Sequence, residues 1–196
     1  MLTSISPLGE RARNNRWGVT VGAYVVASTA AAAAVGTAVG AVGSVVPLSA
    51  TPRGALLAAV VAAAVVCDAG GFPLPTVHRQ VNEDWLRRYR GWAYGAGFGA
   101  QLGVGVVTIV TSATVYAALA GELLAGSALA GAAIGAAFGL ARALPLPVGG
   151  RARSFADLAS LHRRLVGLGS AGRRATVTVG ALAVTVLVAT SVGSVR

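Results

Sequence analysis

Long stretches without a charged residue alternate with short polar segments along the whole chain. In chain order, the uncharged stretches cover residues 17–48, 54–67, 91–121, 123–141 and 175–195. About 20 apolar residues are enough for a helix to cross the hydrocarbon layer of a membrane. The pattern therefore predicts an all-α integral membrane bundle of five transmembrane helices, or of four if the short second stretch does not cross.

Charged residues are scarce, and arginine dominates them. They make up 11% of the 196 residues, and the 16 basic side chains, all arginine, outnumber six acidic ones. With five crossings, 14 arginines lie on one side of the membrane, whereas four crossings divide them 12 to 4. The positive-inside rule then predicts the cytoplasmic (inner) cell membrane, with the N-terminus in the cytoplasm. Residues 1–16 are expected to be a polar tail before a retained signal-anchor helix; the alternative is a signal peptide cleaved at Ala-Ser-Thr-Ala near position 28.

Two parts of the chain resemble each other. A Pro-Leu-Pro triplet follows the second apolar stretch at residues 73–75 and recurs after the fourth at 145–147. Asn-Arg-Trp before the first stretch, at 15–17, resembles Arg-Gly-Trp before the third, at 90–92. We interpret 1–196 as a single transmembrane domain built from two parallel hairpin repeats and a final helix. Repeat 1 covers about 15–90, repeat 2 about 91–174, and the final helix 175–195.

Two basic segments between the apolar stretches, residues 77–92 and 154–168, carry apolar side chains at helical spacing. In the second segment, Ser154 and Asp157 have the spacing of a capping box, which starts a helix. An amphipathic helix with arginine on its polar face lies naturally on an anionic leaflet. The expected partner is therefore the lipid bilayer, with anionic lipid at the cytoplasmic face.

Glycine recurs every four residues in two of the predicted helices. The residues are Gly91, Gly95, Gly99 and Gly103 in the third apolar stretch, and Gly131, Gly135 and Gly139 in the fourth. In lipid, helices associate largely through close approach of their backbones, which glycine permits. We predict that these glycines pack helices together, within the chain or between copies of it, or line a groove for a ligand.

Polar side chains form a second stripe on the third predicted helix, away from its glycines. If this stretch is one continuous helix, the stripe consists of Tyr94, Gln101, Thr108 and Ser112. An unpaired amide is costly in hydrocarbon, so Gln101 is expected to face the bundle. Two interpretations stay open. The stripe makes interhelical hydrogen bonds, for example from Gln101 to Ser28 or Thr29, or it forms a polar path for a solute.

Four charged residues lie at the ends of the predicted helices. Asp68 and Arg142 end the second and fourth helices on the cytoplasmic side. Arg53 and Glu122 lie at the opposite side. Opposite charges at the same depth attract strongly where the dielectric constant is low. We therefore expect Asp68 to pair with Arg142, and Arg53 to pair with Glu122.

The sequence contains no catalytic or cofactor-binding motif. His78 and His162 have no cysteine or well-spaced carboxylate near them, so no metal site is predicted. Cys67 is the only cysteine, which excludes an internal disulfide. We expect no enzyme activity and no cofactor. The arginines flank apolar stretches rather than a soluble face, which argues against a nucleic-acid partner.

The segment RYRGWAYGAGFGAQLGVGVVTIVTSATVY, residues 88–116, resembles uncharacterised polytopic integral membrane proteins of actinobacteria. This resemblance covers a small part of the chain and brings no activity with it. In outline the chain is also similar to small membrane electron carriers of the cytochrome c biogenesis type. That family shuttles electrons through two intramembrane cysteines. Because Cys67 is alone in this chain, the family's chemistry does not transfer.

Taken together, these features favour a multi-pass membrane protein that acts as a scaffold or as a subunit of a membrane complex. Its partners would be other membrane subunits or a second copy of itself. The alternative is a small-solute transporter or channel-like carrier whose path follows the polar stripe of the third helix. No acid, lysine or histidine falls at the centre of a predicted helix, which argues against proton-coupled transport.

Overall fold

Helices are the only regular secondary structure in the part of the chain that the computed structural model describes, residues 5–76, 84–107, 109–151 and 154–193. In chain order they are α1 (Pro7–Ala12), α2 (Trp17–Ser44), α3 (Ala50–Gly70), α4 (Trp85–Arg88), α5 (Gly91–Val104), α6 (Thr114–Leu124), α7 (Ala128–Ala143), α8 (Pro145–Val148), the 3-10 helix η1 (Gly149–Arg151), α9 (Phe155–Gly167) and α10 (Gly169–Gly193).

Three described helices are long and apolar enough to cross a membrane. They are α2, α3 and the run Ala128–Val148, which joins α7 to α8. The predicted second stretch, 54–67, is extended at both ends in α3, so its helix is long enough to span. Helix α6 and residues 174–185 are apolar but shorter. The all-helical class is confirmed, and the long apolar helices suit a membrane.

The third predicted helix, residues 91–121, is not continuous. Helix α5 ends at Val104, Gly105 takes φ +84°, and the next helix, α6, begins only at Thr114. A residue with positive φ stops a helix, and glycine adopts such a conformation without a Cβ penalty. The interpretation of this stretch as a single helix was therefore wrong. Composition could not reveal the break, because residues 106–113 are as apolar as the helices around them.

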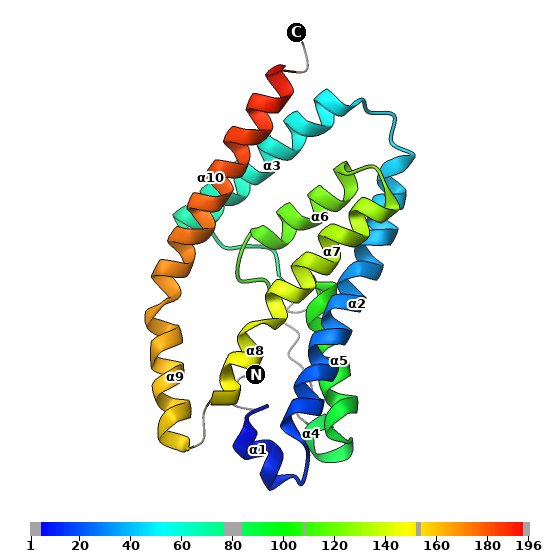
Figure 1. Ribbon diagram of the computed structural model, residues 1–196. Coiled ribbons are helices and arrows are strands. Elements are labelled where there is room, and N and C mark those ends of the chain that lie inside the picture. The colour runs from blue at the N-terminus through cyan, green and yellow to red at the C-terminus, as the bar shows by residue number, and fades with distance from the viewer. Residues whose placement is uncertain (1–4, 77–83, 108, 152–153, 194–196) are drawn as a thin grey trace.

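Helix α2 is the axis of the bundle, with α5 along its first half and α7 along its second half (Figure 1). One stripe of α2 with a spacing of four residues makes these contacts. Its members are Thr20, Tyr24, Ser28, Ala32, Gly36 and Gly40, all buried. The α2–α5 contacts advance in the same direction along both helices, so these two helices run parallel. Ser28 lies where the two contacts meet.

A second group of helices lies beside this axis (Figure 1). Helix α10 packs along α3, while α6 contacts α3 on one side and both α2 and α7 on the other. Helix α1 and the last turns of α10 lie toward opposite ends of the molecule (Figure 1). Figure 1 also shows that the chain runs up α2, down α3, up through α5 and α6, down α7, and up again through α9 and α10.

The two Pro-Leu-Pro triplets of the predicted repeat differ in conformation. Residues 73–75 follow α3 without helical structure, whereas residues 145–147 form most of α8. The predicted basic segment 77–92 falls partly on residues 77–83, outside the described residues, and continues as α4. In the other basic segment, the Ser154 and Asp157 side chains bond reciprocally to each other's backbone N–H at the start of α9.

The N-terminal segment folds back under the bundle. Helix α1 begins with Ser6, whose Oγ accepts a hydrogen bond from the Gly9 N–H, followed by proline at the first helical position. This is the expected chemistry of a helix start. A buried cluster joins this segment to the other helices, and it consists of Ile5, Val21, Tyr24, Tyr94, Phe98, Ala143 and Leu146. Residues 5–16 are therefore part of the fold and not a free tail.

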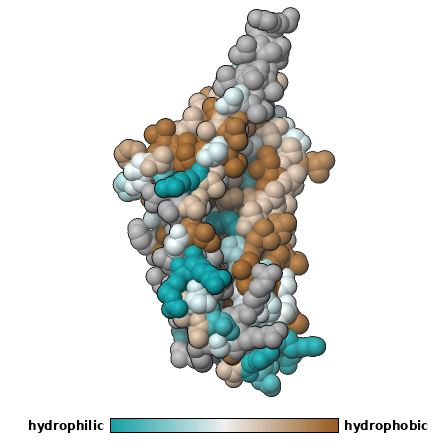
Figure 2. Space-filling view, turned by 60° about the vertical axis from the view of Figure 1, so that its left-hand side comes forward, coloured by the Kyte–Doolittle hydropathy of each residue, from teal (hydrophilic) through white to brown (hydrophobic). Residues whose placement is uncertain are grey.

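Apolar side chains cover much of the described surface on the face that Figure 2 shows. Hydrophilic residues gather toward the lower end of that view, while apolar colour dominates above it. Large apolar side chains point outward from every long helix; Leu129 of α7 is 81% exposed and Val26 of α2 is 70% exposed. Such a contiguous apolar exterior is unusual for a monomer in water and suits contact with lipid or with other apolar helices.

Gly99→Ala is expected to destabilise the fold, whereas Gly22→Ala is not. A Cβ on Gly99 would collide with the Tyr24 carbonyl of α2, but a Cβ on Gly22 would meet nothing within 4 Å. Overpacking of this kind costs about 1–3 kcal/mol. Unfolding of the purified protein in mixed detergent micelles, followed by circular dichroism, measures the difference. Equal stabilities of the two variants would contradict the packing described here.

Candidate functional site

The break between α5 and α6 is held in place by a carboxylate from another helix. Asp68, in the last turn of α3, accepts hydrogen bonds from the Ala113 N–H (2.8 Å) and from the Ser112 hydroxyl (2.7 Å). Helix α6 has no side-chain cap from its own N-cap residue. An acceptor with negative charge at a helix N-terminus satisfies free N–H groups and interacts favourably with the helix dipole. Asp68 therefore caps α6 from a distance of 45 residues along the chain.

The other side of the break carries the opposite charge. The Arg142 guanidinium of α7 donates to the Gly105 carbonyl (3.4 Å), at the C-terminal end of α5, and lies over the Phe138 ring. A cation at a helix C-terminus complements the free carbonyl groups there. Asp68 and Arg142 thus support the two sides of the break, and the structure does not pair them with each other.

Arg53 also binds backbone rather than its expected partner. Its guanidinium donates to three carbonyls around the end of α2, those of Gly43, Val46 and Leu48, at 2.8 to 3.0 Å. A longer bond, 3.4 Å, reaches the Leu124 carbonyl at the end of α6. A planar guanidinium presents five N–H donors, so one arginine can serve several free carbonyls at once. Arg53 thereby joins the ends of two helices.

Glu122 is buried between helices without a charged partner. Its side chain in α6 is 2% exposed, and its Oε2 has no hydrogen-bond partner among the described residues. A Cβ on Gly135 of α7 would lie 3.2 Å from its other carboxyl oxygen, so the missing side chain makes room for it. The sequence placed Glu122 at a membrane boundary beside Arg53. The structure instead buries it against α7.

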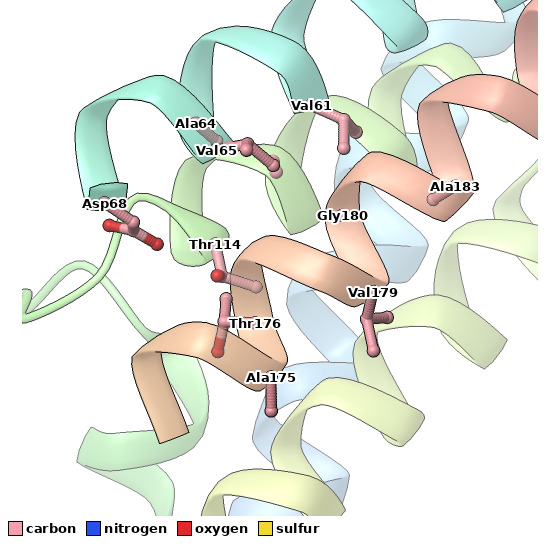
Figure 3. Close-up of a pocket in the computed structure, with 11 residues that line it drawn as sticks. Val61, Ala64, Val65, Asp68, Thr114, Ala175, Thr176, Val179, Gly180 and Ala183 are labelled. Atoms are coloured by element: carbon pink, nitrogen blue, oxygen red, sulfur yellow. The ribbon is translucent and has the colours of Figure 1, made fainter. Parts of the chain in front are cut away.

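Two adjoining cavities lie beside Asp68. The first lies between α3, α6 and α10 (Figure 3), and the second lies beyond it, next to the segment that precedes α6. The first, of about 390 Å³, is almost entirely apolar. Valine, alanine and glycine line most of it: Val61, Ala64, Val65, Ala117, Ala175, Val179, Gly180 and Ala183. The second, of about 550 Å³, is more polar and includes Cys67, Thr111 and Ser112. Asp68 and Thr176 line both cavities, so together they form one cleft with an apolar and a polar part.

The cleft holds few reactive groups. Its carboxylate, Asp68, already accepts two hydrogen bonds, and its remaining polar groups are hydroxyls and the Cys67 thiol. Within the described ranges, no three histidine, cysteine or acidic side chains come together as metal ligands. The arrangement can accept an apolar or amphiphilic guest, but it does not assemble a nucleophile with a base.

The predicted polar stripe is divided by the helix break. Tyr94 lies at the start of α5 and Ser112 lies beyond its end. The rotation of about 100° per residue holds only within one helix, so it does not place these two side chains on a common face. The Tyr94 hydroxyl bonds the Glu10 carboxylate, and Ser112 bonds Asp68. Gln101 is half-buried, and Thr108 lies outside the described residues. The Ser28 hydroxyl, an expected partner of Gln101, donates instead to the Gly139 carbonyl (3.0 Å).

Sequence reasoning missed a buried polar cluster around Glu10. This α1 carboxylate is 0% exposed, forms an ion pair with Arg13 (2.6 Å) and accepts a hydrogen bond from Thr20 Oγ1 (2.8 Å). Tyr94 completes the cluster, and the Asn15 amide donates to the tyrosine oxygen (3.3 Å). The cluster ties α1 to α2 and α5. The Ser-Pro start at residues 6–7 was the available sign that this segment is helical.

All seven glycines of the predicted packing set lie against α2. Gly91, Gly95, Gly99 and Gly103 of α5 face Thr20, Tyr24 and Ser28, while Gly131, Gly135 and Gly139 of α7 face Ser28, Ala32, Gly36 and Gly40. For six of the seven, the nearest atoms that a Cβ would meet include a backbone carbonyl of α2. Within one chain, therefore, these glycines allow backbone-to-backbone contact between helices.

No protein-family model, curated protein or solved structure matches the chain.

Asp68→Ala is expected to loosen the start of α6. Loss of the cap should cost about 1–2 kcal/mol and speed amide hydrogen exchange over the first turn of this helix. Asp68→Asn keeps an acceptor oxygen and should retain most of the protection. Exchange measured by mass spectrometry on peptides containing residues 113–117 tests both variants. Unchanged exchange in Asp68→Ala would show that the cap does not hold the break.

A disulfide engineered across the cleft should form readily. The Val65 Cβ lies 3.9 Å from the position of a Cβ on Gly180, which is within the range of disulfides. We expect V65C/G180C, in a chain whose native Cys67 is replaced by serine, to oxidise without unfolding. The control pair V66C/G180C should not, because Val66 is 61% exposed on another side of α3. Free thiol titration distinguishes the two, and equal oxidation would contradict the packing of α10 on α3.

Proposed function

We propose that the protein is a multi-pass membrane scaffold or subunit of a membrane complex, without chemistry of its own. The observation that carries this proposal is how the described polar groups of the bundle are used. Asp68, Arg142 and Arg53 serve helix ends, and the Tyr94 hydroxyl is bonded within the Glu10 cluster. Side chains engaged in this way support the architecture and are not available to pass a solute along.

The contacts of α2 support the same proposal. Transport by alternating access needs one group of helices to move against another. Here α5 and α7 both approach the backbone of α2 at glycines, and Ser28 bonds across to α7. Contacts at this separation leave little freedom for sliding, because interiors are packed closely and resist deformation. A fixed bundle is better suited to holding partners than to carrying a solute along the third helix.

We further propose five crossings of the cytoplasmic membrane, with the N-terminus in the cytoplasm. The third crossing would be formed by α5 and α6 together, and the fifth by α10. A break in a crossing is tolerated where its backbone is protected by protein, and here Asp68 and Arg142 provide that protection. The distribution of the arginines supports this orientation, with the basic segments on an anionic leaflet.

The partner surface is proposed to be the outer face of α3 and α10. Helix α3 is the least buried of the long apolar helices, because only 6% of its most apolar segment is buried by the rest of the protein. On α10, Val179 is 66% exposed and Leu182 is 62% exposed. Another membrane subunit, or a second copy of this chain, would find many apolar side chains there for close packing.

A photo-crosslinking amino acid at Leu182 tests this proposal in the native membrane. We expect a discrete crosslinked product, whose mass identifies a second copy of the chain or another subunit. The same probe at Arg163, an exposed position of α9, is the matched control and should give no discrete product. If Leu182 and its neighbour Val179 both crosslink only to lipid, the proposal of a partner on this face fails.

A further inference from the structure

Two similar sequences that lie 75 residues apart meet at one end of the bundle. Asn-Arg-Trp spans the start of α2 and Arg-Gly-Trp spans the start of α5, and these two helices start side by side and run parallel. A cavity of about 200 Å³ lies between the two starts. Its polar and aromatic lining comes from Asn14, Asn15, Arg16, Arg90 and Trp92, with the Gly91 backbone beside them.

Among the described residues, the positive charge of this cavity has no direct acidic partner. The side chains of Arg16 and Arg90 are exposed, and neither forms an ion pair or hydrogen bond with the described part of the chain. The nearby acid, Glu10, does not line the cavity but accepts a hydrogen bond from Thr20, which does. The Glu10 carboxylate is also paired with Arg13. Two arginine side chains therefore line the opening, and no carboxylate of the described residues pairs with them.

The backbone adds to this charge. Arg16 and Arg90 are the N-cap residues of α2 and α5, and neither helix has a side-chain cap at its start. The Asn15 amide oxygen accepts the Gly91 N–H through a long bond of 3.4 Å, and its amide nitrogen donates to Tyr94. The first N–H groups of a helix and its dipole favour an anion, so both helix starts act in the same sense as the arginines.

We propose that this cavity binds the phosphate group of an anionic phospholipid. Arginine recognises phosphate oxygens through charged hydrogen bonds with its planar fork of donors. Trp92, 56% exposed, and Val19, 51% exposed, lie at the same opening. Tryptophan is typical of the membrane interface, so the acyl chains can continue over the apolar surface that begins there. A zwitterionic phospholipid is disfavoured, because the ammonium group of its headgroup would lie beside two arginines.

The proposal rests on the membrane location inferred above, but not on a partner subunit. Its test uses the full-length protein in neutral detergent, titrated with phosphatidylglycerol and followed by native mass spectrometry. The wild type should bind one phosphatidylglycerol more tightly than phosphatidylcholine. R16Q/R90Q should weaken this binding about tenfold or more, since charged hydrogen bonds are lost. R163Q/R164Q removes the same charge from α9, which we place on the leaflet without a cavity for one phosphate. It should lower the general attraction to anionic lipid but weaken the single tight phosphatidylglycerol less than about twofold.

Two further arms keep the test decisive. R16K/R90K keeps the charge but loses the fork, and should bind with intermediate affinity. Circular dichroism of each variant verifies that the fold is kept. Equal affinities of R16Q/R90Q and R163Q/R164Q, or of phosphatidylglycerol and phosphatidylcholine, would overturn the proposal. If millimolar inorganic phosphate releases the lipid, the cavity binds free phosphate rather than a phospholipid, and the proposal is overturned. None of these results bears on crosslinking at Leu182.

Discussion

Contact between helix backbones, made possible by glycine, is the constraint on which the rest of this structure depends. Seven glycines of α5 and α7 face a single stripe of α2, and a side chain at most of these positions would collide with an α2 carbonyl. In a membrane there is little hydrophobic force to bring helices together, so contact area and dispersion matter more than in water. Helix α2 therefore becomes an axis for α5 and α7, and the cavity between the helix starts takes its position from it, whereas the cleft lies in the second group of helices.

Three charged side chains, those of Arg53, Arg142 and Asp68, share one role in the described structure, which is to satisfy the ends of helices. Arg53 donates to carbonyls at the ends of α2 and α6, Arg142 to the end of α5, and Asp68 accepts from the start of α6. An unpaired backbone group in an apolar medium costs several kcal/mol. This cost is about as large as the stabilisation that an ion pair can contribute in the same medium. A charge near a free helix end is thus used at least as well as one in an ion pair.

Much of the helical architecture could be predicted from runs without charge, while its interruptions could not. The limits of α2 and the register of the glycines follow from composition and a spacing of four. The break at Gly105 does not, because an apolar segment looks the same whether its glycine is helical or left-handed. The expected pairs of Asp68 with Arg142 and of Arg53 with Glu122 assumed that opposite charges pair with each other. That assumption left out the free backbone N–H and carbonyl groups at the helix ends. The burial of Glu10 was missed because residues 1–16 were interpreted by their overall polarity and not by the helix start at Ser6 and Pro7.

The central claim is that α2 touches α5 and α7 through its backbone, and solid-state NMR of glycine-labelled protein in bilayers tests it most directly. Gly40 and Gly131 should show a direct contact between their α-carbons, because a Cβ on Gly40 would lie 3.1 Å from the Gly131 α-carbon. Gly22, on another face of α2, should show no such contact to α5 or α7. If Gly40 and Gly131 show no contact in the assigned spectrum, α2 is not the axis of the bundle.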